Sequence, residues 1–382
     1  MANTLTNVLP SLLAQGVLAL RQQAVMPRLV NRSYESLAAS EGNVVNIPIP
    51  SSISQRAVTP SITMNSNVDS SPTAAVVTLD YWYEAPFQLS DSDYVSASSR
   101  FVPMQASEAV KALANGVDTY MLGKHTGIFG AAGTAGTAPF NGSLTAAAGA
   151  MKRLDRQLAP PDDRRAMIDP TARENFVLNT AILQVDQRGN DEGLIKGTIG
   201  TKLGFDWYMD QNIASYTPGT AWASGNIAST VGGAVGDTTL NIINATASGQ
   251  IKVGDIFSFT ADTSSHQYVV TVTNTISATV QVAITFYPGL KTTVATGATL
   301  IVVSIPYTVN LAFHRDAFAW ASRPLTNVGG GGNVFQAPTD PVSGLALRLE
   351  LSRQYKQDTF SYDILGGGNL VRKELACKIM GQ

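Results

Sequence analysis

The stretch "NLAFHRDAFAWASRPL", Asn310–Leu325, reads as a strand followed by a short helix. It contains His314-Arg315-Asp316, the tripeptide that opens the catalytic loop of protein kinases. A kinase also needs a glycine-rich loop, a strand lysine, a metal-binding D-F-G and an Asn five residues after the loop Asp. The chain has no D-F-G, and Ala321 stands five positions after Asp316. Because nothing would bind the metal that neutralises the γ-phosphate, the tripeptide does not indicate a kinase.

The segment before this stretch differs sharply in composition from the rest of the chain. Only five of the 89 residues from Tyr216 to Ser304 are charged, about 6% against 14% for the whole chain. Short Thr- and Val-rich runs, such as "TTLNII", "DIFSFT", "YVVTVTN", "TVQVAITF" and "ATLIVVS", alternate with turn residues. This pattern predicts a small all-β barrel or sandwich, inserted into a host of mixed α and β elements. The fold class is therefore α+β.

A long hairpin is predicted over Asn43–Leu79. The strand-like runs "NVVNIPIP" and "TAAVVTLDYWYEAPF" flank a segment rich in Ser, Asn and Pro. A two-stranded ribbon alone is marginally stable in water and has little of its own to bury. We therefore expect either a mobile loop or a hairpin that a partner covers.

Three helices are predicted between the hairpin and the β segment. The first runs from Pro103 to Gly123 and the second from Leu144 to Leu158. The third follows a short strand in "RRAMIDPTARENFVL", with Asp169 as its N-cap and Pro170 at its first position. The apolar stripe of the first helix comprises Val110, Leu113, Ala114, Val117 and Met121.

The last part of the chain, "GLALRLELSRQYKQDTFSYDILGGGNLVRKELACKIM", reads as two or three strands broken at Gly366–Gly368. Arg348 and Glu350 alternate with leucines, which predicts a sheet with one covered and one wetter face. The leucines that share the covered face are Leu345, Leu347, Leu349 and Leu351.

Composition and charge narrow the class of protein. With 382 residues and 44% hydrophobic content, the chain is long enough to bury a substantial core. The net charge of -2 offers no basic stripe, which disfavours a dedicated nucleic-acid reader. One cysteine, Cys377, allows no internal disulfide and fits a reducing compartment. The apolar run Val8–Leu20 is interrupted and lacks a preceding basic segment, so it predicts an amphipathic helix or arm and no membrane span.

No catalytic, metal or cofactor-binding residue is predicted, and the chain is not expected to be an enzyme. The three histidines lie far apart without metal-site spacing, no G-x-S-x-G elbow occurs, and Cys377 reads as a buried apolar side chain. The Gly- and Ala-rich loop after Gly123 follows a helix and lacks a P-loop lysine, so it reads as a linker. Asp206 and Asp210 are spaced for one helical face, but they read as ordinary polar positions in an aromatic patch.

The order of these parts is specific. "RRAMIDPTARENF", "GFDWYMDQNI", the module with "GQIKVGDIFSF", "NLAFHRDAFAWASRPL" and the closing "YDILGGGNLVRKELACKI" follow one another. In this order they resemble the major capsid (coat) proteins of tailed bacteriophages, over nearly the whole chain. The resemblance is to the branch with an inserted β domain, like the coat protein of the short-tailed Salmonella phage.

The resemblance implies the Hong Kong ninety-seven type fold, with an extended loop, a peripheral domain with a spine helix, and an axial domain. The spine helix would be the predicted helix Pro103–Gly123. Carried over, the parts are an N-terminal arm (1–42), the extended loop hairpin (43–80), the peripheral domain with the spine helix (81–165), the first part of the axial domain (166–213), the inserted β domain (214–304), and the second part of the axial domain with closing peripheral strands (305–382).

The resemblance also implies a structural role in the virion. Many copies would form hexamers and pentamers in an icosahedral shell that encloses double-stranded DNA without sequence-specific binding, assembled in the bacterial host cytoplasm. Portal and scaffolding proteins are the other expected partners. The candidate intersubunit contacts are Asn46, Ile49, Arg56, Trp82 and Tyr83.

Two details follow from the same resemblance. His314, Arg315 and Asp316 are expected to make intrachain or intersubunit hydrogen bonds where the chain re-enters the axial domain. Some members cross-link through a loop lysine, but Arg56 is the only basic residue in the loop here, so such cross-linking is not expected.

Two other classes remain open. A β-rich binding or adhesin-like module would bind a ligand through residues 216–304 alone, and the full chain would stay monomeric. An enzyme with an unrecognised site would carry a deep polar pocket with perturbed titrating groups.

Overall fold

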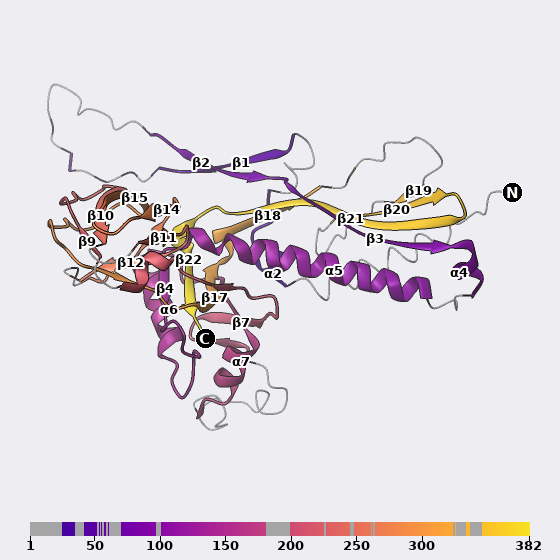
Figure 1. Ribbon diagram of the computed structural model, residues 1–382, viewed down its shortest axis with the longest axis horizontal. Coiled ribbons are helices and arrows are strands. Elements are labelled where there is room, and N and C mark those ends of the chain that lie inside the picture. Colours follow the sequence, from indigo (N-terminus) through magenta and orange to yellow (C-terminus); the bar gives the residue numbers. More distant parts are fainter. Residues whose placement is uncertain are drawn as a thin grey trace. The chain divides into compact units, whose positions relative to one another are not determined.

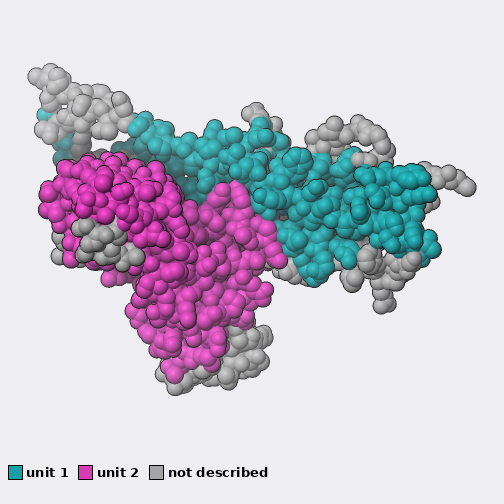
Figure 2. Space-filling model, viewed as in Figure 1, with its two compact units in different colours: residues 1–19, 31–113, 319–371 teal, residues 20–30, 114–318, 372–382 magenta. Residues whose placement is uncertain are grey.

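The chain forms two compact units, coloured separately in Figure 2. Unit 1 comprises residues 1–19, 31–113 and 319–371, and unit 2 comprises residues 20–30, 114–318 and 372–382. The computed structural model describes residues 25–34, 42–51, 53, 55, 57–58, 60, 70–96, 101–180, 199–224, 227–244, 248–260, 262, 264–323, 325, 334–336 and 346–382. None of the described helices combines the length and apolar character needed to cross a membrane.

The predicted hairpin is present in unit 1. Strand β1 (Val44–Ile49) pairs antiparallel with β2 (Thr73–Thr78), in a register that runs from Val44 opposite Thr78 to Ile49 opposite Thr73. The two strands lie side by side as a separate ribbon in Figure 1. Because side chains alternate along a strand, the ribbon has one buried and one exposed face.

One face of the hairpin is covered by the same chain, which corrects the expectation that it has little of its own to bury. Val45 and Ile47 of β1 pack with Val77 and Leu79 onto small residues of the segment 319–321. The opposite face keeps Val44 49% exposed and Val76 41% exposed. A hairpin covered on one side only still leaves apolar surface for a partner. The small residues that complete the covered face are Ala319 and Ala321.

Unit 1 also contains a five-stranded sheet. Its order is β18-β21-β20-β19, and β3 pairs with β21. In β20 the described leucines 347, 349 and 351 are buried while Arg348 and Glu350 are half-buried, which confirms the predicted alternation; Leu345 lies outside the described residues. The strands are β3 (Tyr81–Ser90), β18 (Phe318–Ser322), β19 (Val334–Gln336), β20 (Leu347–Gln354) and β21 (Gln357–Leu370), and the short helix α4 (Asp91–Ser96) follows β3.

The glycines 366–368 do not break the last strands, contrary to the sequence-based expectation. Strand β21 runs through them to Leu370. A Cβ at Gly366 would lie 2.5 Å from the Trp320 ring, and a Cβ at Gly367 would overlap the carbonyl oxygen of Thr78. Because glycine has no side chain, Trp320 and Thr78 can lie directly against β21, and the strand continues without a break.

Helix α5 (Phe101–Gly123) is the predicted long helix, and it begins two residues before Pro103. Pro103 therefore stands in its first turn, where a missing N–H costs no intrahelical hydrogen bond. All five residues of the predicted apolar stripe are buried.

Unit 2 is built on a second sheet, with strand order β4-β22-β17-β5-β7-β6 and β8 paired to β17. Asp169 caps α7 by accepting hydrogen bonds from the N–H groups of Thr171 and Ala172, so the predicted strand–turn–helix corner is confirmed. The elements are β4 (Gly130–Ala132), α6 (Thr145–Arg156), β5 (Arg164–Ile168), α7 (Pro170–Val177), β6 (Thr201–Lys202), β7 (Phe205–Met209), β8 (Ser215–Tyr216), β17 (Tyr307–His314) and β22 (Ala376–Met380).

The prediction that Asp206 and Asp210 share a helical face is wrong, because β7 is a strand. Asp206 pairs in register with Arg165 of the parallel neighbour β5, and its carboxylate accepts from the Thr201 hydroxyl at 2.5 Å. Asp210 lies just beyond the strand end and is buried. Phe205 and Trp207 are both buried while Asp206 between them is half-buried, which is the spacing of a strand. Over so few residues the sequence alone did not distinguish this spacing from a helical one.

The inserted segment folds as a six-stranded antiparallel sheet, in the order β16-β12-β13-β15-β10-β9. Its two edge strands meet: Ala228 bridges Thr299, and the Ser229 N–H donates to the Ala298 carbonyl at 3.0 Å. The sheet therefore closes into a small barrel and not a sandwich. Its strands are β9 (Ile227–Ser229), β10 (Thr239–Asn244), β12 (Ile256–Phe259), β13 (Tyr268–Val270), β15 (Gln281–Tyr287) and β16 (Leu300–Val302), with β11 (Gly249–Ile251) and β14 (Asn274–Ile276) as a separate pair.

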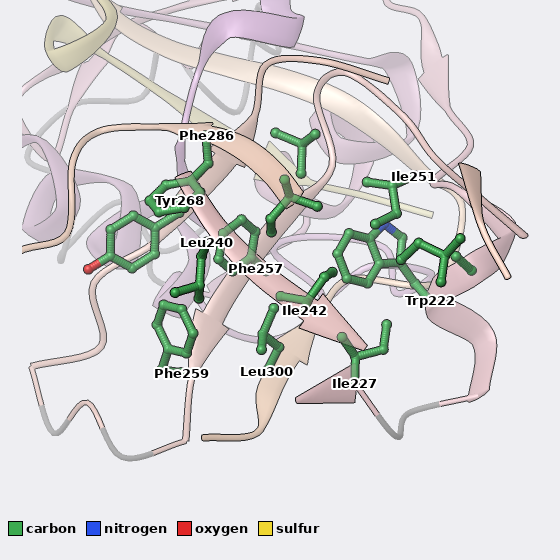
Figure 3. Packing of buried hydrophobic residues seen from close by; sticks show 14 of the residues in the cluster. Trp222, Ile227, Leu240, Ile242, Ile251, Phe257, Phe259, Tyr268, Phe286 and Leu300 are labelled. Atoms are coloured by element: carbon green, nitrogen blue, oxygen red, sulfur yellow. The ribbon is translucent and has the colours of Figure 1, made fainter. Parts of the chain in front are cut away.

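The barrel has its own aromatic core. Figure 3 shows Trp222, Phe257 and Tyr268 among the side chains of one buried cluster. The Phe257 ring stacks on Tyr268 at 5.6 Å between centroids and meets Phe286 edge-on at 5.5 Å. Such aromatic pairs add to the free energy gained from burial alone. The prediction that the module has a core separate from its host is confirmed.

The opening stretch connects two sheets along the chain, since it begins within β17 of the unit 2 sheet and continues through β18 of the unit 1 sheet. After β17 come one 3-10 turn, Arg315–Ala317, and then β18, so the short helix predicted here is a single turn between two strands. The Asp316 N–H donates to His314 Nδ1 at 3.2 Å, and the Arg315 N–H donates to the Asp163 carbonyl at 3.3 Å. The expected intrachain hydrogen bonds of this tripeptide are therefore present.

Candidate functional site: an assembly surface and a buried domain junction

Four of the five candidate contact residues lie among the described residues, on β1 and β3; Arg56 lies outside them. Asn46 stands on the exposed face of β1, whereas Ile49 is half-buried on the opposite side. On β3, Trp82 is 63% exposed and Tyr83 is 59% exposed. Since neighbouring strand residues point to opposite faces, the structure does not bring Trp82 and Tyr83 together on one face.

Trp82 is fixed in place by a buried ion pair that sequence reasoning missed. Its indole N–H donates to the Asp363 carboxylate at 3.2 Å. The same carboxylate is held by the guanidinium of Arg348, through Nε at 3.0 Å and Nη2 at 2.5 Å. Asp363 is only 4% exposed, so this two-point contact satisfies a charge that would otherwise be costly to bury. In the sequence, the charged residues that alternate with the leucines of β20 were the feature that could have indicated this ion pair.

Ser361 and Glu84 extend the same polar face of the sheet. The Ser361 hydroxyl donates to the Glu84 carboxylate at 2.8 Å across the β21–β3 pair. On this face the exposed Trp82 side chain therefore has polar neighbours, of which Arg348 and Asp363 are mostly or fully buried beneath the surface. Aromatic residues and arginines are the residue types that most often dominate protein–protein contacts.

In unit 2, a buried carboxylate lies where the barrel joins the host sheet. Asp255 is 1% exposed. Its Oδ1 accepts from the Tyr216 hydroxyl at 2.8 Å, and its Oδ2 accepts from the Trp222 indole at 2.5 Å. The N–H groups of Gly219 and Lys252 add further hydrogen bonds at 3.1 Å and 2.7 Å. Because Tyr216 belongs to β8 of the host sheet, Asp255 links the two parts of the unit.

Lys378 of β22 completes this junction from the host side. Its side chain is fully buried, and Nζ donates to the Gly254 carbonyl at 3.2 Å. Burial lowers the pKa of Lys378 to about 7, while the charge of Asp255 acts in the opposite direction. Burial likewise raises the pKa of Tyr216 well above its ordinary value, and the neighbouring Asp255 adds to that effect.

His125 and Cys377 are buried groups with a structural role. Burial lowers the pKa of His125 to about 3, and its ring meets Tyr216 edge-on at 5.6 Å. Cys377 is fully buried, and burial raises the pKa of its thiol to about 12, which fits the predicted apolar role. Within the described ranges, no three His, Cys, Asp or Glu side chains are grouped closely enough to hold a metal ion.

Comparison with known proteins rests on structure. No protein-family model matches the sequence, and no curated protein matches it. A solved structure titled "Mycobacterium phage Che8" is similar with a TM-score of 0.51 and 18% identity, over 94% of this chain and 91% of that chain. One titled "Capsid structure of the Cyanophage P-SCSP1u" is similar with a TM-score of 0.50 and 12% identity, over 94% and 88%. The chain therefore has the mixed α and β fold of phage capsid proteins, the Hong Kong ninety-seven type, with a small barrel set into it.

Proposed function

We propose that this chain is the major capsid protein of a tailed bacteriophage, a structural and non-enzymatic component of the virion. The observation that carries this proposal is a capsid-type fold that spans 94% of the chain. The domain boundaries given above for the arm, extended loop, peripheral, axial and inserted domains form part of the proposal. No feature of the described residues favours a catalytic role over this one.

The finer proposal is that copies of the chain form hexamers and pentamers in an icosahedral shell around double-stranded DNA. A hairpin with one covered and one exposed face supports it, because a neighbouring copy can bury Val44 and Val76. The near-neutral net charge of -2 suits a wall that encloses DNA without binding it tightly. Portal and scaffolding proteins would be the further partners, with assembly in the host cytoplasm.

The test is the size of the purified chain, measured by light scattering and followed by electron microscopy. Closed shells, rings or tubes are expected, with a scaffolding partner added if the chain alone stays small. A chain that remains monomeric with that partner would contradict the proposal and favour the β-rich binding module.

A variant pair locates the contact. Asn46→Arg places a charge on the exposed face of β1 and is expected to abolish assembled particles while leaving the melting temperature of the unassembled chain unchanged. Asn46→Ser is the matched control and should assemble normally. Particles of normal size and yield from Asn46→Arg would place the contact elsewhere.

A further inference from the structure

A cleft of about 310 Å³ lies in unit 2 between helix α6 and the barrel. One wall carries Arg153 and Arg156 from the last turns of α6. The other wall carries His266 and Lys291 from the barrel, and Phe129 and Pro288 add apolar surface. The cleft is separate from the Asp255–Lys378 junction, since neither of those residues lines it.

The two arginines are held in position by the loop opposite. Arg153 Nη1 donates to the Ser265 carbonyl at 2.6 Å, and Arg156 Nη1 donates to the Ser264 carbonyl at 2.7 Å. The loop itself is shaped by Asp262, whose carboxylate accepts from the Ser264 N–H at 2.9 Å. Because a guanidinium has five N–H donors, each arginine keeps most of its donors for another ligand.

The cleft carries more positive than negative charge. Its lining holds three basic side chains, Arg153, Arg156 and Lys291, against one carboxylate, Glu374, which gives a formal balance of +2. Glu374 already accepts from the Tyr287 hydroxyl. Of the carboxylates that the structure describes, none lies within 4.0 Å of these three cations. Burial lowers the pKa of Arg153, and the charge of Arg156 acts in the same direction.

The imidazole of His266 is held in one orientation by Asp262. Its ring Nδ1 lies 2.8 Å from the Asp262 carboxylate, and the same carboxylate accepts from the backbone N–H of His266 at 3.0 Å. A ring fixed through Nδ1 leaves Nε2 as the nitrogen that can meet a ligand in the cleft.

We propose that this cleft binds a phosphate group, either inorganic phosphate or a small phosphate monoester. Two guanidinium forks and an ammonium group match a tetrahedral dianion with several acceptor oxygens. The volume exceeds that of the ion alone, so the substituent of a monoester can pack beside Phe129 and Pro288. A bound dianion balances the formal charge of +2 and joins α6 to the barrel.

The test is a thermal unfolding titration of the full, unassembled chain with inorganic phosphate, AMP or a short DNA duplex, each at constant ionic strength set with chloride. Phosphate and AMP are expected to raise the melting temperature saturably, by about 2 °C at tenfold excess over Kd. No rise beyond that of chloride, or a rise with the duplex alone, would overturn the phosphate site.

Lys291→Gln is the main variant, because no hydrogen bond or ion pair joins its side chain to any described residue, so the fold should survive. It is expected to weaken phosphate binding about fivefold. Lys252→Gln removes the other lysine of the barrel, whose Nζ donates to the Thr217 carbonyl, and should leave binding unchanged. Equal losses of phosphate affinity in both variants would show a non-specific effect of net charge and contradict a site in the cleft.

Discussion

The indole N–H of Trp222 donates to the carboxylate of Asp255 across 2.5 Å in the interior of unit 2. This single contact joins the aromatic core of the barrel to the polar junction with the host sheet. Trp222 is packed in the apolar cluster, while Asp255 also receives the hydroxyl of Tyr216 from the host. Packing of the barrel and its attachment therefore depend on the same carboxylate.

Replacing that carboxylate should destabilise the barrel strongly. Asp255→Ala leaves the buried donors of Trp222, Tyr216 and Gly219 without an acceptor, so the free energy of unfolding should fall by about 3 kcal/mol or more. Urea unfolding followed by tryptophan fluorescence measures the loss. Asp237→Ala, which removes only an exposed turn contact with the Ala234 N–H, should cost less than about 1 kcal/mol. Comparable losses in the two variants would contradict this role for Asp255.

The glycines of β21 should not tolerate side chains. Gly367→Ala places a Cβ against the Thr78 carbonyl and should lower the free energy of unfolding by about 2 kcal/mol or more, because the backbone of Thr78 and Leu79 must move away. Thermal unfolding monitored by circular dichroism gives the change. Gly123→Ala is the control, since its Cβ would meet no atom within 4 Å and it stands in a helix. It should be neutral or slightly stabilising, and a neutral Gly367→Ala would show that β21 ends before this residue.

Lys378 should make stability rise with pH on the alkaline side of neutrality. Its folded pKa of about 7 lies below its ordinary value of 10.5, so between these values the unfolded chain binds more protons and the folded state gains as pH rises. Lys378→Met should remove this slope, as measured by urea midpoints at pH 7 and pH 10. The exposed Lys111→Met should retain it. An unchanged slope in Lys378→Met would mean that Nζ is not desolvated.

Asp118 should give the opposite slope on the acid side. Its carboxylate accepts from the Met26 N–H at 3.2 Å, and burial raises its pKa to about 7, with the charge of Asp210 acting in the same direction. Between 3.8 and 7 the folded chain holds a proton on Asp118 that the unfolded chain has lost, so the contribution of this group to stability falls as pH rises through this range.

The buried His125 contributes with the opposite sign below its ordinary pKa of 6.5, so the contribution of Asp118 is read from the difference in stability between wild type and Asp118→Asn at pH 4.5 and pH 7.5. That difference should shift in favour of Asp118→Asn as pH rises, whereas the difference for Asp237→Asn should not change. A difference for Asp118→Asn that is the same at both pH values would contradict the raised pKa.

Local signals were sufficient for most elements of this fold. The alternation in β20, the Asp169-Pro170 start of α7 and the turn-bounded runs of the barrel each depend on neighbours within a few residues. The order of these elements then indicated the capsid-type fold. Sequence alone did not separate a barrel from a sandwich, because that depends on β9 meeting β16 at the opposite end of the module.

What sequence reasoning missed depends on distant partners. Lys378 meets Gly254 across 124 positions, and Trp82 meets Asp363 across 281. The continuity of β21 through Gly366 and Gly367 depends on Trp320 and Thr78, which no local window contains. A charged residue in an apolar context reads as solvated until its partner is known, and for this reason neither the junction nor the phosphate cleft was expected.

Strands β8 and β17 pair at the point where the barrel is inserted, with Tyr216 opposite Tyr307 and Ser215 opposite Thr308. This pairing determines how much of the host sheet a change in the inserted module would affect. The chain leaves the host sheet after Tyr216 and returns at Tyr307 directly opposite, so the barrel is inserted at the tip of a two-stranded hairpin of the host. Insertions at such tips disturb little of the framework beneath them. The inserted module can thus differ in size or content while the strand order of the host sheet stays the same.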